Sequence, residues 1–123
     1  MKLSIDYNTS RYTINSYEAG LIVVNNQSYE KSLLISAESL HLQWNPGHID
    51  ELTKDHIDSI LELKPEIILL GTGTELKFPG QQLMIHALTQ GVGIEVMDTG
   101  AACRTYNVLS AEDRNVVAAL IIG

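Results

Sequence analysis

The sequence has a single cysteine, Cys103, and no long hydrophobic run. One cysteine excludes a disulfide scaffold within the chain and a thiolate metal cage built by one chain. A helix that spans a bilayer needs roughly 18 apolar residues in a row, and no stretch of the sequence reaches that length. Residues 1–7 lack the apolar core of a secretion signal and the arginine-rich character of a transit peptide. We therefore expect a bacterial cytoplasmic protein without direct membrane insertion.

Basic side chains are also scarce. The chain has 8 Lys and Arg against 15 Asp and Glu, a net charge of -7. Such a chain lacks the electrostatic footprint of a nucleic-acid-binding protein, but it suits a partner with a basic surface. The 123 residues, 45% of them hydrophobic, suffice for one core. We therefore predict a single domain, residues 1–123.

The local motifs of several enzyme classes are missing. The sequence has no Gly-x-Ser-x-Gly, and its histidines have neither His-Glu-x-x-His nor His-x-His spacing. Leu76 takes the place of the third glycine in a dinucleotide-binding motif, and there is no phosphate-loop lysine. We therefore expect no metal, no cofactor and no catalytic residue, and favour a protein that is not an enzyme.

The first third of the chain has the pattern of β-structure. The β-branched run 21–24 precedes Asn25 and Asn26, which tolerate the positive φ of a hairpin turn. We expect residues 28–35 to form the partner strand. Apolar and polar residues alternate over residues 40–44, which predicts a half-buried strand.

The middle of the chain predicts a β-α-β unit. A helix over residues 50–63, with Thr53 as a possible N-cap, precedes an apolar strand over 66–70. Pro79 is expected at the first position of the next helix and Gly91 just past its end. Residues 93–97 form the following strand. Strands joined by such a crossover helix should be parallel.

The last third continues with a helix and a further apolar run. Ala102, Cys103, Tyr106 and Leu109 fall on one helical stripe, and a structural role is expected for Cys103. We interpret residues 116–122 as a buried strand, although a helix capped by Ser110 or Asp113 is an open alternative, because periodicity alone does not separate the two in so short a run.

The tetrad Asp98-Thr99-Gly100-Ala101 matches the active-site loop of retroviral aspartic proteases. Those enzymes are all-β and need two such loops to bring two carboxylates together. Here the tetrad lies late in the chain, after a predicted β-α-β unit and before a helix. We therefore interpret it as a helix start, with Asp98 or Thr99 as the N-cap.

In this context the sequence resembles a known family over nearly its whole length. The resemblance is carried by residues 32–35 with Trp44, by 71–74, Pro79, 93–99, Ala102, 104–109, Glu112, Arg114 and 116–120, and is most specific over 97–109. The family is that of small α/β proteins of unknown function that includes mitochondrial respiratory complex I assembly factor 3 and the adipogenesis-associated domain-containing protein.

The resemblance implies a fold rather than a reaction. It implies a three-layer, Mth938-like α/β domain, with an N-terminal β layer packed on a central mixed, largely parallel sheet with helices. It also implies that the last apolar run is a strand of that sheet. The mitochondrial members act in the assembly of a membrane complex.

A candidate ligand or partner crevice follows from the predicted parallel strands. Two loops leave their carboxyl ends, and open α/β sheets bind ligands at that edge. The candidate residues are Gly71, Thr72, Gly73, Thr74, Asp98, Thr99, Gly100, Arg104, Tyr106 and Asn107. The alternative is structural: the glycines permit tight turns, Tyr106 lies in the core and Asn107 bonds to loop backbone.

These observations favour a non-catalytic binding or assembly module that acts through a protein partner or through a small ligand at the loop edge. A second hypothesis is an enzyme or small-molecule binder that uses Asp98, Thr72 or Thr74, and Arg104. A third is a homo-oligomer that forms through an exposed N-terminal sheet.

Overall fold

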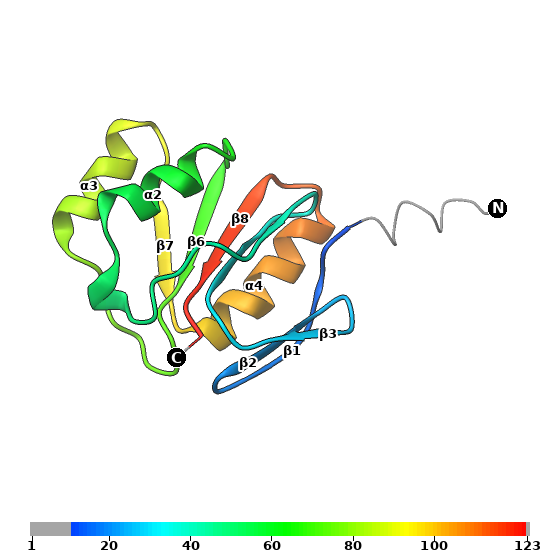
Figure 1. Cartoon of the computed structure of the whole chain (residues 1–123). Coiled ribbons are helices and arrows are strands. Elements are labelled where there is room, and N and C mark those ends of the chain that lie inside the picture. The colour runs from blue at the N-terminus through cyan, green and yellow to red at the C-terminus, as the bar shows by residue number, and fades with distance from the viewer. Residues whose placement is uncertain (1–10, 123) are drawn as a thin grey trace.

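The computed structural model describes residues 11–122 (Figure 1). The segment 1–7, assessed above as a targeting sequence, lies outside the described residues. The strands are β1 (Ile14–Glu18), β2 (Leu21–Val24), β3 (Gln27–Tyr29), β4 (Leu33–Ile35), β5 (Leu40–His41), β6 (Ile67–Gly71), β7 (Ile94–Met97) and β8 (Val116–Leu120). The helices are the 3₁₀ turn η1 (Ile49–Glu51), α2 (Lys54–Leu61), α3 (Gln81–Thr89) and α4 (Thr99–Ala111).

The strands form two sheets. The small sheet is antiparallel, in the order β1-β2-β3, and the large sheet has the order β5-β4-β8-β6-β7. β6 is parallel to both β7 and β8, with Ile68 opposite Ile94 on one side and Val117 on the other. The parallel β-α-β unit is therefore confirmed. β4 pairs with β8 and with β5 in the antiparallel sense, so the sheet is mixed.

The final apolar run is a strand because both faces of the large sheet are covered. Val116, Ala118 and Leu120 belong to the core on one face, and Val117, Ala119 and Ile121 belong to the core on the other. Alternate residues of a strand point to opposite faces, so a run that is apolar throughout suits this central position. The helix alternative for residues 116–122 is thereby rejected.

The layers follow from these two cores. α2 and α3 cover one face of the large sheet, and α4 covers the other (Figure 1). The small N-terminal sheet packs on α4, where Ile14, Ile22 and Val24 share a core with Tyr106 and Leu120. The expected N-terminal β layer is present, and α4 mediates its packing on the large sheet.

Two strand predictions needed correction. The β2–β3 hairpin turns at Asn25 and Asn26, with φ of 48° and 69° as expected. The predicted partner strand 28–35 is however split between the two sheets, because all of Leu33–Ile35 is buried and belongs in the large sheet. The strand predicted over 40–44 is only β5, since Trp44 turns into the core, where its Nε1 donates to the His56 carbonyl at 3.1 Å.

Most of the residues predicted to begin or end a helix do so in the structure. Thr53 caps α2, which starts at Lys54 after the separate turn η1 rather than at residue 50. Gly91 follows α3 with a φ of 85°, in the left-handed conformation that ends many helices. Pro79 precedes the N-cap Gly80, so its predicted place at the first helical position was wrong.

Candidate functional site

The corner between β7 and α4 contains the tetrad. Asp98 is the N-cap of α4, and its carboxylate accepts a hydrogen bond from the Ala101 N–H at 2.9 Å. This confirms the helix-cap interpretation. The carboxylate satisfies one of the free N–H groups of the first turn and lies at the positive end of the helix dipole. The surrounding fold is α/β, which is incompatible with an all-β aspartic protease.

Thr99 links three segments of the chain at this corner. Its side chain is fully buried, and its hydroxyl donates to the Ile121 carbonyl at 2.6 Å and accepts from the Gly73 N–H at 2.8 Å. The Thr99 N–H in turn donates to the Gly73 carbonyl at 2.9 Å. Thr99 therefore holds together the loop after β6, the start of α4 and the end of β8 through its hydroxyl and its backbone N–H.

The glycines of the β6 loop allow this close approach. A Cβ atom on Gly71 would lie 2.9 Å from Thr99 Oγ1 and 3.0 Å from Thr99 Cα, which is closer than real Cβ contacts. Gly73 has a φ of 107°, a conformation that favours glycine. Both glycines thus have structural reasons to be present.

Thr72 and Thr74, from the same loop, differ in their surroundings. Thr72 is buried, and its hydroxyl donates to the Glu75 carbonyl at 2.7 Å and accepts from the Lys77 N–H at 3.1 Å. Thr74 is exposed. The Thr72 hydroxyl is therefore occupied in shaping the loop.

The structure brings only part of the predicted crevice together. Gly71, Gly73, Asp98, Thr99 and Gly100 meet at the loop edge. The exposed Arg104 reaches the same corner, since a Cβ on Gly100 would lie 3.5 Å from Arg104 Nη1.

Tyr106 and Asn107 are engaged elsewhere. Tyr106 is fully buried, and its hydroxyl donates to the Tyr12 carbonyl at 2.7 Å. The Asn107 amide accepts from the Ile14 N–H at 3.0 Å and donates to the Ile14 carbonyl at 2.7 Å. Both side chains attach the N-terminal segment to α4. Tyr106 lies in the core as the structural alternative had it, whereas Asn107 bonds to the backbone of strand β1 rather than to that of a loop.

Cys103 lies in the core between α4 and the two sheets. Burial raises the pKa of its thiol to about 12, although the nearby Arg104 opposes this shift. The pKa of Tyr17 is also raised, first by burial and then by Cys103 and Asp98. Because the thiolate is the reactive form of cysteine, Cys103 has the properties of a structural residue.

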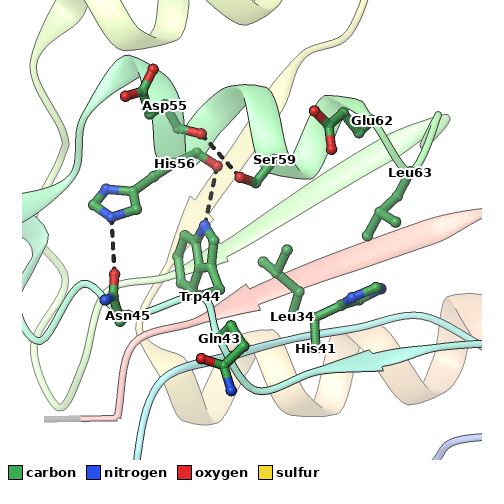
Figure 2. A pocket seen from close by; sticks show the side chains of 10 residues that line it. All are labelled: Leu34, His41, Gln43, Trp44, Asn45, Asp55, His56, Ser59, Glu62 and Leu63. Carbon is green, nitrogen blue, oxygen red and sulfur yellow. Dashed lines mark hydrogen bonds between the residues drawn. The ribbon is translucent and has the colours of Figure 1, made fainter.

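A hollow that the sequence did not predict lies between α2 and the segment 41–45 (Figure 2). Its volume is about 400 Å³. It is lined by Leu34, His41, Gln43, Trp44, Asn45, Asp55, His56, Ser59, Glu62 and Leu63. Two sequence patterns hinted at its walls: polar residues alternate at 41, 43 and 45, and polar residues recur at helical spacing at 55, 59 and 62.

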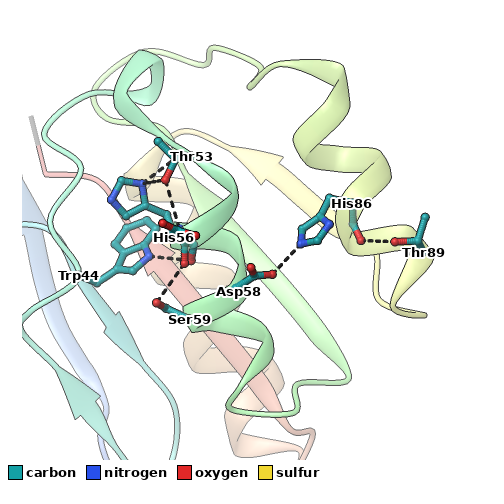
Figure 3. A network of polar contacts seen from close by, with 8 residues as sticks. Trp44, Thr53, His56, Asp58, Ser59, His86 and Thr89 are labelled. Atoms are coloured by element: carbon teal, nitrogen blue, oxygen red, sulfur yellow. Dashed lines mark hydrogen bonds and ion pairs between the residues drawn. The ribbon is translucent and has the colours of Figure 1, made fainter.

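A polar network fixes α2 beside this hollow (Figure 3). His56 Nδ1 accepts from the Thr53 N–H at 3.0 Å, while the Thr53 side chain accepts from the His56 N–H at 3.4 Å. The ring proton therefore belongs on Nε2, which lies 3.4 Å from Asn45 Oδ1. At the other side of α2, Asp58 pairs with His86 of α3 at 2.6 Å.

Within residues 11–122, no cluster of three or more His, Cys, Asp or Glu side chains is arranged to hold a metal ion. In the same part of the chain no helix is both long and apolar enough to cross a membrane.

Comparison with known proteins places this geometry in context. Residues 14–121 match the family described as "Protein of unknown function (DUF498/DUF598)". The chain is 35% identical over 106 residues to the "13 kDa major membrane protein" of Francisella tularensis subsp. holarctica (strain LVS). The aligned region covers 85% of this chain and 86% of that protein.

Two further matches are a human protein and a solved structure. It is 32% identical over 110 residues to human "NADH dehydrogenase [ubiquinone] 1 alpha subcomplex assembly factor 3", covering 88% of this chain but 59% of the human protein. The solution structure of a Bordetella pertussis protein described as a Mth938-like domain aligns at 30% identity with a TM-score of 0.82 and covers 99% of this chain and 92% of that one. The expected family and Mth938-like fold are confirmed.

Proposed function

Because the chain belongs to the DUF498/DUF598 family, we propose that it is a non-catalytic module that binds a protein partner during the assembly of a larger complex. The name of its human relative, an assembly factor, supports an assembly role. The chain spans 59% of that relative, so the identity of the complex does not carry over with the family.

The observation that carries the proposal is a concentration of exposed apolar side chains in one stretch of the chain, the loop after β6 and helix α3. Of the six large hydrophobic side chains exposed in residues 11–122, four lie within 76–88: Leu76, Phe78, Ile85 and Leu88. Phe78 is 69% exposed and Leu88 61%. We call these four residues the apolar end.

The surroundings of the apolar end add to this support. The segment 78–94, which holds three of these four residues, contains no Asp, Glu, Lys or Arg, whereas Leu76 lies between Glu75 and Lys77. Depletion of charge around exposed aromatic and aliphatic side chains is typical of the centre of a protein–protein interface, and clustered apolar exposure marks interaction sites.

The loop edge supports the same proposal indirectly. The Thr72 and Thr99 hydroxyls and the Asp98 carboxylate all take part in hydrogen bonds that hold the backbone in place. Residues used in this way are less suited to binding and converting a substrate. The crevice at Gly71 to Thr74 and Asp98 to Gly100 is therefore the weaker proposal, and the cytoplasmic location and oligomer formation stay predictions.

Affinity purification of the tagged protein from its native host tests the proposal. The double variant Phe78→Ser with Ile85→Ser should lose a partner that the unmodified protein recovers. The matched control is Val108→Ser, because Val108 is 58% exposed on α4, away from the apolar end. Failure to recover any recurrent partner, or equal recovery by all three proteins, would contradict the proposal.

A further inference from the structure

The hollow beside α2 is open to solvent and has walls of different character (Figure 2). Leu34, Trp44 and Leu63 contribute apolar surface. One wall is the polar stripe of Asp55 and Ser59 on α2, followed by Glu62. The other wall is formed by His41, Gln43 and Asn45. We call this feature the α2 groove.

The α2 groove lies in the most acidic part of the chain. Residues 50–66 contain six acidic and two basic side chains, so they carry a net charge of -4 out of -7. Two of these carboxylates, Asp55 and Glu62, line the groove, and no lysine or arginine is among its lining residues. The potential in the groove therefore favours a cation.

The polar atoms of the groove are rich in hydrogen-bond acceptors. Asp55 and Glu62 bring carboxylates, and Gln43 and Asn45 bring amide oxygens. The Ser59 hydroxyl already donates to the Asp55 carbonyl at 3.1 Å, which leaves its lone pairs to accept. Arginine carries five N–H donors in a planar fork and accepts none. Its aliphatic stem can also cover apolar surface while the charged head stays among polar groups.

From this complementarity we propose that the α2 groove binds an arginine side chain that protrudes from a partner protein. The stem of the arginine lies against the partly buried Leu63, above the buried Leu34 and Trp44, and its guanidinium faces the exposed carboxylates of Asp55 and Glu62. A small-molecule site usually buries most of the surface of its ligand. This groove is open, so it suits a side chain that protrudes from a protein better than it suits a free small molecule.

This site is distinct from the apolar end. The groove borders β5, at one edge of the large sheet, whereas α3 contacts β7, at the opposite edge. The inference therefore goes beyond the proposed function, and the two fail independently. Loss of a partner in the Phe78 and Ile85 variant tests the apolar end alone.

The chain offers a built-in reporter for the groove. Trp44 is its single tryptophan, it lines the groove, and its Nε1 donates to the His56 carbonyl on α2. The probe is a capped tripeptide with arginine between two leucines, and the matched control peptide has neutral citrulline in place of arginine. Titrations of both follow Trp44 fluorescence and its single indole N–H signal in ¹⁵N NMR.

We expect saturable changes with the arginine peptide and binding about fivefold weaker with the citrulline peptide, as expected for an exposed ion pair. The variant Asp55→Asn with Glu62→Gln should remove this preference. Glu75→Gln with Glu112→Gln, which removes the same charge elsewhere on the surface, should keep it. Equal binding of both peptides, no change at Trp44, or an unaltered preference in the Asp55 and Glu62 variant would overturn the proposal.

Discussion

Gly71 and Thr99 approach so closely that a Cβ atom on residue 71 would lie 2.9 Å from the Thr99 hydroxyl and 3.0 Å from Thr99 Cα. This contact joins the end of β6 to the start of α4, which are far apart in sequence. Thr99, one of the residues of the predicted crevice, packs directly against Gly71. The contact therefore explains how the loop after β6 meets the start of α4, where the Thr99 hydroxyl and backbone bond to Gly73.

The first prediction concerns this contact. Gly71→Ala should lower the free energy of unfolding by about 2 kcal/mol, because backbone atoms of α4 must shift to admit the methyl group. Chemical denaturation monitored by circular dichroism measures the change. Gly93→Ala is the control, since a Cβ there meets only Leu88 Cδ2 at 4.0 Å. Equal stability of the two variants would show that β6 and α4 are not packed as described.

Thr99 itself provides the second prediction. Thr99→Val keeps the shape of the side chain but leaves the buried Gly73 N–H and Ile121 carbonyl without their partner. We expect a loss of about 3 kcal/mol, since each unsatisfied buried group costs about 1 to 3 kcal/mol. Thr99→Ser keeps the hydroxyl and should lose only about 1 kcal/mol, the value of a buried methyl group. If Ser is as damaging as Val, packing rather than hydrogen bonding dominates this position.

The third prediction is a loss of stability in alkali. Burial raises the pKa of the Cys103 thiol from 9.0 to about 12 and that of the Tyr106 hydroxyl from 10.0 to about 12. Above pH 9 the unfolded chain therefore binds fewer protons than the folded chain, and linkage requires stability to fall as pH rises. The contribution is complete below pH 9 and is lost towards pH 12.

Denaturation midpoints measured between pH 7 and pH 11 test this dependence. Cys103→Ala should flatten the curve in the lower part of that range, because it removes the group that titrates first on unfolding. A thiol reagent at pH 8 offers a second measurement: Cys103 should react slowly in the folded protein and quickly in denaturant. Rapid reaction of the folded protein would contradict the burial of Cys103.

The fourth prediction concerns the start of α2. Thr53→Ala and His56→Ala should each lower stability by about 1 kcal/mol, since each removes one half of the capping box. The double variant should cost less than the sum of the two, because the same pair of residues makes both contacts. Thermal unfolding of the four proteins measures the coupling. Strict additivity would mean that the two side chains act independently.

Parts of the candidate site were accessible from sequence and parts were not. The N-cap role of Asp98 followed from its type and its place before a helical pattern, because capping is a local interaction. The role of Thr99 was not accessible, since its partners Gly73 and Ile121 are 26 and 22 residues away. The α2 groove needs two segments that only the packing of α2 on the large sheet brings together.

The sequence by itself determined most of the local structure: the Asn25–Asn26 turn, the Thr53 and Asp98 caps, the left-handed Gly91 and the β-α-β unit around α3. These features depend on the conformational preferences of neighbouring residues. Only the tertiary structure decided how residues 28–35 divide between two sheets and that Trp44 leaves its strand for the core. It also decided that Thr99 packs against Gly71. The physical reason is that burial and hydrogen bonding between distant segments override local preference wherever both faces of a segment must be covered.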